Sequence, residues 1–128
     1  MFQMKIREQL KKKRVLIPLL FLLVVFSLNL VKHEFVFYLP FNIPGDQTAA
    51  TIPPFGIFIE EKFETENPKN PCAVINHERI HWIQYKRMGL TSFYYNYLKC
   101  YFVSGRINHW MEDEAREPCF GKKSKSSL

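Results

Sequence analysis

The sequence predicts an α+β protein, in which an N-terminal transmembrane helix precedes a small domain of short strands, a central helix and two further helices. Three observations lead to this prediction. An uncharged apolar run covers residues 15–31, a β-branched and aromatic run covers residues 55–63, and a helical pattern covers residues 72–88. The chain has 128 residues, which leaves room for one small domain after the membrane helix.

The first 35 residues predict an uncleaved membrane anchor. Residues 1–14 hold six lysines or arginines, and the apolar run with the aromatic residues behind it places the anchor at residues 15–35. The end of the run lacks the small-residue cleavage site of a secretory signal, so we favour an anchor over a cleaved signal sequence. Because basic flanks stay in the cytoplasm, we expect a single-pass protein with a cytoplasmic N-terminus and its domain on the opposite side.

The net charge of +6 is concentrated at the two ends of the chain, and the middle is close to neutral. A nucleic-acid-binding domain needs a basic face on its folded surface, so this distribution argues against nucleic acid as a partner. The lipid bilayer is the partner that the sequence indicates most directly. The basic tail, residues 120–128, is of low complexity, and we expect it to be disordered.

Residues 36–54 are rich in proline and glycine, and we expect an irregular connector there. The domain proper is expected over residues 55–119, beginning with a strand at residues 55–63. A helix over residues 72–88 should follow, with Asn70 as its cap and Gly89 at its end.

Two more helices are expected, over residues 93–103 and residues 109–117. The first should be capped by Thr91 or Ser92 and end at Gly105. The second should be capped by Asn108 and end at Pro118. The first of them is apolar and aromatic over most of its surface. It therefore either buries the central helix or lies at the membrane interface.

The segment "NHERIH" on the central helix contains His77, Glu78 and His81. Residues four apart lie on one face of a helix, so both imidazoles can reach a single metal ion. Zinc in catalytic sites takes three protein ligands and a water molecule, and it lowers the pKa of that water. A glutamate directly after the first histidine can take the proton of this water as a general base. The alternative is a pair of exposed histidines on an amphipathic helix.

A third ligand is available in the later segment "WMEDEARE". A glutamate from this second helix would complete a His-His-Glu zinc site, although acidic residues also suit a helix start because of the helix dipole. Gln84 lies on the same helix face as His77 and His81. It can bind a substrate carbonyl, orient a ligand, or serve as a structural amide between helices.

The segments "NHERIHWIQ" and "MEDEARE", with "PFGIFI" upstream, resemble small, uncharacterised HExxH proteins of the gluzincin-like kind. The resemblance covers about residues 53–117 and implies a minimal zincin-like domain with a Zn²⁺ cofactor. In that family the third ligand is the glutamate three residues before an alanine, which here makes Glu112 the ligand. This chain has Arg116 where the family often has an aspartate, so Glu114 is the second candidate.

The remaining histidines and the cysteines carry weaker signals. His33 borders the anchor, and His109 is either a metal ligand or, as we favour, a capping or packing residue. One pair among Cys72, Cys100 and Cys119 can form a disulfide outside the cytoplasm, but their spacing does not select the pair.

The function expected from these features is that of a hydrolase: a membrane-anchored zinc metalloprotease acting on a peptide or protein substrate. In this interpretation His77, His81 and Glu112 bind the metal, and Glu78 is the catalytic base. The alternative is a non-catalytic membrane protein of the same fold, with structural zinc or none.

Overall fold

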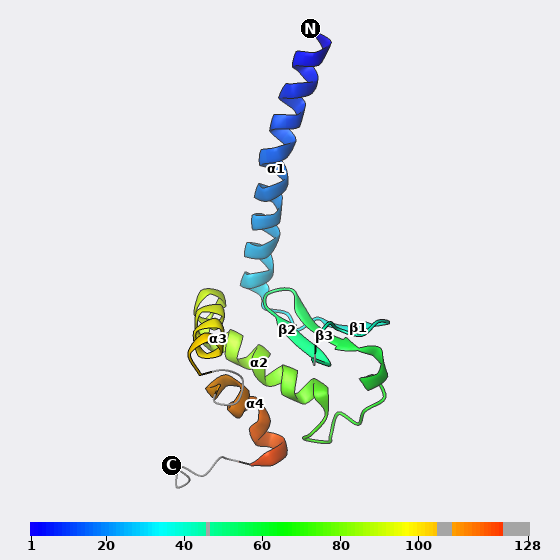
Figure 1. The fold of residues 1–128 in the computed structure, drawn as a ribbon, viewed down its shortest axis with the longest axis vertical. Coiled ribbons are helices and arrows are strands. Elements are labelled where there is room, and N and C mark those ends of the chain that lie inside the picture. The colour runs from blue at the N-terminus through cyan, green and yellow to red at the C-terminus, as the bar shows by residue number, and fades with distance from the viewer. Residues whose placement is uncertain (46, 105–108, 122–128) are drawn as a thin grey trace. The chain divides into compact units, whose positions relative to one another are not determined.

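A computed structural model describes residues 1–45, 47–104 and 109–121 (Figure 1). The chain forms two compact units, Met1–Lys32 and His33–Leu128. The first unit is a single helix, and the second, which we call the C-terminal domain, combines a three-stranded sheet with three helices. The predicted α+β class is therefore confirmed.

The first unit consists of helix α1, Phe2–Val31, whose 30 residues extend over about 45 Å. None of its residues is buried. Among the described residues it is the one helix long and apolar enough to cross a membrane, as an anchor or as a signal sequence. The helix ends where Lys32 takes a left-handed φ of 52°, so Phe35 lies beyond it.

Three short strands form a mixed sheet in the C-terminal domain: β1 (Val36–Leu39), β2 (Ala49–Ile52) and β3 (Gly56–Glu60). Their spatial order is β1-β3-β2, with β1 parallel and β2 antiparallel to the central strand β3. Ile57 and Ile59 of β3 are buried in the core. Strand β2 is an edge of this sheet, because it pairs with β3 on one side only among the described strands.

The structure corrects the prediction that residues 36–54 are irregular, because β1 and β2 lie in this segment. Its prolines and glycine fall in the turns around these strands, and four-residue strands are too short to show a clear alternating pattern. The strand expected over residues 55–63 is also shorter than predicted. It ends at Glu60, and a 3₁₀ turn, η1 (Glu61–Phe63), follows.

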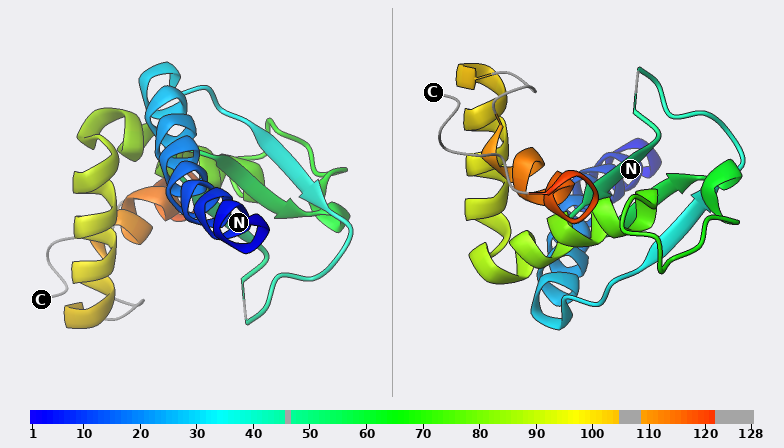
Figure 2. Two further views of the ribbon diagram at one scale, coloured as in Figure 1. Left: turned by 90° about the horizontal axis from the view of Figure 1, so that it is seen from above. Right: turned by 90° about the horizontal axis from the view of Figure 1, so that it is seen from below.

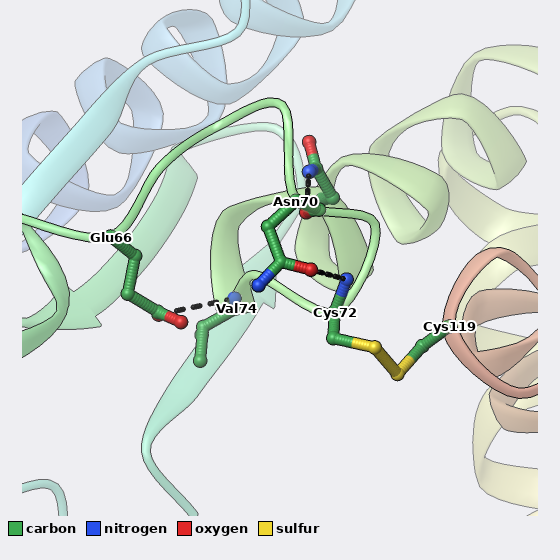
Figure 3. The surroundings of a disulfide bond; sticks show 6 residues. Glu66, Asn70, Cys72, Val74 and Cys119 are labelled. Atoms are coloured by element: carbon green, nitrogen blue, oxygen red, sulfur yellow. Dashed lines mark hydrogen bonds between the residues drawn. A yellow bond between two sulfur atoms is a disulfide. The ribbon is translucent and has the colours of Figure 1, made fainter.

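Helix α2, Val74–Met88, carries the motif residues and begins two residues later than predicted. Asn70 does not cap it, because Ala73 occupies the N-cap position. Instead, the Asn70 side-chain oxygen accepts a hydrogen bond of 3.0 Å from the Cys72 N–H, which closes a turn ahead of the helix (Figure 3). The predicted end at Gly89 is confirmed, and its φ of 84° is a conformation that glycine adopts at little cost.

Helix α3, Leu90–Ser104, begins directly after Gly89 and turns away from the end of α2 (Figure 2). The predicted caps Thr91 and Ser92 are therefore wrong, since both lie inside the helix. The predicted helix end at Gly105 lies outside the described residues.

Helix α4, Trp110–Phe120, is the last described element. It continues through Pro118, so the predicted end at this residue is wrong. A proline in the last turn costs only one backbone hydrogen bond, and that turn closes with a bond of 2.7 Å from the Gly121 N–H to the Glu117 carbonyl. The predicted cap Asn108 lies outside the described residues.

Helix α2 is the central element of the C-terminal domain. It contacts β2 and β3 of the sheet, and α3 and α4 both pack against it (Figure 1). Four of its five buried residues recur at the spacing of one helix face: Glu78, His81, Trp82 and Tyr85. Trp82 and Tyr85 pack in the hydrophobic core. Glu78 and His81 occupy the N-terminal half of the same face.

Candidate metal centre

Three side chains from two helices converge at this polar half of the α2 face. His77 and His81 come from α2, and Glu112 comes from the first turn of α4. Their candidate ligand atoms all lie within 4.8 Å of one another. The Nε2 atom of His77 is 3.1 Å from Oε2 of Glu112, and Nε2 of His81 is 3.2 Å from Oε1 of the same carboxylate. This His-His-Glu group could hold a metal ion.

Two separations within this group are close to those between the ligand atoms of a small divalent cation. Bonds of about 2.0–2.2 Å in a tetrahedral arrangement separate neighbouring ligand atoms by about 3.3 Å. The two separations between imidazole nitrogen and carboxylate oxygen are close to this value. Imidazole and carboxylate together are donors for zinc and for other first-row transition metals.

Glu112 and His81 shift each other's pKa in opposite directions. Burial raises the pKa of Glu112, but hydrogen bonds from His77 and His81 outweigh burial and hold this pKa far below its ordinary value. Burial lowers the pKa of His81, but the hydrogen bond and the charge of Glu112 outweigh it, so the net pKa is raised. The ionised form of Glu112 and the protonated form of His81 therefore favour each other.

Gln84 fixes the orientation of the His81 ring. Its side-chain nitrogen donates to the carbonyl of Met111 at 3.0 Å, so its oxygen faces His81, 2.9 Å from Nδ1. His81 Nδ1 is then a donor, which leaves Nε2 to bind a metal. Gln84 is fully buried, and the structure places it behind a candidate ligand.

Glu78 is bound by a residue that the sequence did not single out. The hydroxyl of Thr51 in β2 lies 2.6 Å from Oε2 of Glu78 and 3.0 Å from the backbone carbonyl of the same residue. Glu78 is only 7% exposed. Thr51 was missed because it lies in a segment that we expected to be an irregular connector.

A pocket of about 540 Å³ opens above these residues. Its walls come from β2 and the residues before it, from α2 and α3, and from α4. Tyr97 of α3 lines it and donates its hydroxyl to Oε1 of Glu112 at 3.2 Å. The His77 side chain is 30% exposed, so the His-His-Glu group is open to solvent through this pocket.

A disulfide joins the two segments that carry the three side chains. Cys72, two residues before α2, is bonded to Cys119 near the end of α4, with a Cα–Cα distance of 4.6 Å (Figure 3). Cys100 is free. The loop closed by this bond contains His77, His81 and Glu112. The spacing of the cysteines gave no signal for this pairing, which depends on how α4 packs against α2.

Glu112 and Glu114 of α4 point in different directions. Glu112 points to the histidines, whereas Glu114 forms a two-pronged ion pair with Arg87 of α2, at 3.0 and 3.1 Å. The structure therefore does not place Glu114 beside His77 and His81. Residues two apart on a helix point in very different directions, so only one of the two glutamates can face the pocket.

The other histidines have structural roles. His109 is fully buried at the N-cap of α4, where Nδ1 accepts from the Met111 N–H at 3.3 Å. Its Nε2 lies 3.0 Å from the carbonyl of Tyr97, so both ring nitrogens are engaged. The favoured prediction of a capping and packing residue is confirmed. His33 stacks edge-to-face on Phe35.

Comparisons with protein-family models, curated proteins and solved structures give no match for this chain. The gluzincin resemblance is therefore supported only by the group of His77, His81 and Glu112. The interpretation of the site depends on the chemistry of these side chains and their neighbours.

Proposed function

We propose that this chain is a membrane-anchored zinc-dependent peptidase that hydrolyses peptide bonds. The observation that carries the proposal is the position of Glu78, which adjoins the His77, His81 and Glu112 group in one open pocket. Two imidazoles and one carboxylate form a ligand set of catalytic zinc. A buried carboxylate beside such a set suits the role of general base.

In this proposal, Glu78, Thr51 and Gln84 each have a separate role in the reaction. Zinc, when bound, supplies a water molecule whose pKa is lowered towards neutrality. Glu78 accepts a proton at its carboxylate and returns it to the nitrogen of the leaving amine. The Thr51 hydroxyl holds Oε2 of this carboxylate, and Gln84 holds His81 in the tautomer that leaves Nε2 free.

The edge strand β2 supports a peptide as the substrate. Residues 49–51 of β2 line the pocket, and one side of the strand is unpaired among the described strands. An extended peptide can add to such an edge through backbone hydrogen bonds. This arrangement would lay the peptide alongside Glu78.

The alternative is a non-catalytic protein with a structural metal. A structural zinc site has four protein ligands and is closed to solvent. Here three candidate ligands adjoin a pocket of about 540 Å³, which favours a catalytic site.

We further propose that α1 is an uncleaved anchor with its basic end in the cytoplasm. The disulfide between Cys72 and Cys119 supports this orientation, because disulfides persist in oxidising compartments outside the cytoplasm. A membrane-impermeant maleimide should label Cys100 in intact cells. In a Cys100→Ser background, a Lys5→Cys variant should be labelled only after permeabilisation. The opposite labelling pattern would reverse the orientation.

The activity is tested on the full chain purified in detergent. Wild-type protein should contain about one zinc per chain and cleave a mixture of unstructured peptides. Glu78→Gln should keep the zinc and lose cleavage by about a thousandfold or more, because the base is absent while the ligands remain. His77→Ala should lose both zinc and cleavage. Wild-type protein that binds no zinc after reconstitution would refute the proposal, and zinc binding without cleavage would favour the structural alternative.

A further inference from the structure

Arg116 of α4 is the one lysine or arginine among the described residues that line the pocket. It stands one turn beyond Glu112 on the same helix, and its side chain is 41% exposed. A cation at this place is not needed to balance the candidate ligands. Glu112 already pairs with His77 and His81 at 3.1 and 3.2 Å.

The ionic contacts of Arg116 are long. One guanidinium nitrogen lies 3.9 Å from Oε2 of Glu112, and another lies 4.0 Å from an oxygen of Asp113. Both distances exceed that of a hydrogen bond. By contrast, Arg87 pairs with Glu114 at 3.0 and 3.1 Å, so it is fully engaged outside the pocket.

From this arrangement we propose that Arg116 binds a carboxylate of the substrate. The chemical class is a peptide with a carboxylate close to the scissile bond, and the inference rests on the peptidase function proposed above. A guanidinium presents paired N–H donors in a plane that matches the two oxygens of a carboxylate. Its proximity to Glu112 would place the bound carboxylate beside the candidate metal ligands, and so near the scissile bond.

Metal binding would strengthen the preference for an anionic group at this place. Once a metal takes up the charge of Glu112, Arg116 faces the pocket without a hydrogen-bonded carboxylate among the described residues. A substrate carboxylate would supply that partner. The carboxylate can come from a free peptide C-terminus or from an acidic side chain beside the scissile bond, and the chemistry of recognition is the same.

The test measures binding, so that it does not depend on turnover. Zinc-loaded Glu78→Gln protein in detergent is titrated by calorimetry with N-acetyl-Phe-Leu, with its C-terminal amide, and with N-acetyl-Phe-Asp amide. The same titrations are made in this background with Arg116→Gln, Arg116→Lys and Arg79→Gln. Arg79 is the control, because it is an arginine of α2 that is paired with Glu34 and does not line the pocket.

At least one carboxylate probe should bind about tenfold or more tightly than the Leu amide. Tight binding of N-acetyl-Phe-Leu alone indicates a free C-terminus, and tight binding of the Asp amide indicates an acidic side chain. Arg116→Gln should abolish the preference at unchanged zinc content, Arg116→Lys should retain part of it, and Arg79→Gln should retain it fully.

Equal binding of all three probes, binding of none, or a preference that survives Arg116→Gln would overturn the inference. These outcomes are separate from failure of the proposed function. A wild-type protein that cleaves neutral and acidic peptides equally would keep the peptidase function and lose this inference. A protein that prefers carboxylate probes but cleaves no peptide would keep this inference and lose the peptidase function.

Discussion

Thr51 and Glu78 are joined across the boundary between the sheet and the central helix, with Oγ1 of Thr51 2.6 Å from Oε2 of Glu78. The two residues are 27 positions apart in the sequence. The edge strand β2 thus lines the pocket and also holds the carboxylate to which we assign proton transfer. A peptide that binds along β2 would lie next to the residue that orients this carboxylate.

Replacing Thr51 by valine should slow peptide cleavage without removing the metal. The valine keeps the shape of the side chain but leaves Glu78 without its donor, so we expect kcat to fall by about tenfold to a hundredfold with little change in KM. Zinc content should stay close to wild type, and the unpaired buried carboxylate should cost about 1–3 kcal/mol of stability. Thr51→Ser is the matched control, since it keeps the hydroxyl and should recover most of the rate. A Thr51→Val protein with full activity would show that this bond is only structural.

Gln84→Leu should weaken zinc binding. The change removes the acceptor for His81 Nδ1 and leaves the Met111 carbonyl without its donor. Loss of such a supporting bond lowers metal affinity by about tenfold to a hundredfold, and the unsatisfied buried groups should cost about 1–3 kcal/mol of stability. Competition with a chelator measures the affinity. Gln84→Glu keeps the acceptor and should bind zinc more tightly than Gln84→Leu, and equal affinity in the two variants would contradict a role through His81.

The metal-free protein should be most stable at mildly acidic pH. The raised pKa of His81 contributes stability that is fully present below its ordinary value of 6.5 and is lost as pH rises through the raised value. The lowered pKa of Glu112 contributes stability that is present above its ordinary value of 4.5 and is lost as pH falls. Both contributions are therefore complete between about pH 4.5 and 6.5. Thermal unfolding of chelator-treated protein from pH 4 to 9 should show this maximum, and Glu112→Gln should flatten it.

Removal of the disulfide should loosen the metal centre as well as the fold. The bond joins residues that are 47 positions apart in the sequence. For a loop of this length, the loss of chain entropy in the unfolded state contributes about 4 kcal/mol to the free energy of unfolding. The double variant Cys72→Ser/Cys119→Ser should lose stability of that order in denaturant unfolding. It should also bind zinc less tightly, because the bond holds the start of α2 near the end of α4. Cys100→Ser is the control and should change neither quantity, since this thiol is unpaired.

The sequence predicted those parts of the fold that depend on local patterns. The long apolar helix, the central helix ending at Gly89 and two later helices follow from hydrophobic periodicity and end signals. Strands β1 and β2 were not predicted. Each is four residues long, and each is stabilised by pairing with β3 rather than by its own pattern. Asn70 was a misleading cap signal, because its side chain closes a turn instead.

The candidate site shows the same division. His77, Glu78 and His81 stand together in the sequence, so their spacing on one helix was enough to suggest metal chemistry. The family resemblance favoured Glu112 over Glu114, but only the packing of α4 against α2 shows that Glu114 is paired with Arg87 instead. Thr51 could not be anticipated, because it contacts Glu78 only through the pairing of strands that the sequence did not reveal.

The order of the ligand residues along the chain has a consequence for biosynthesis. Chains are synthesised from the N-terminus, so α1 emerges first, followed by the segment with Cys72 and the two histidines. Glu112 and Cys119 come later, and the disulfide can close only after both halves of the site have been made. In the proposed membrane-anchored peptidase, the anchor would therefore be synthesised before the metal site is complete. The nascent chain therefore holds only two of the three candidate ligands until the first turn of α4 has been made.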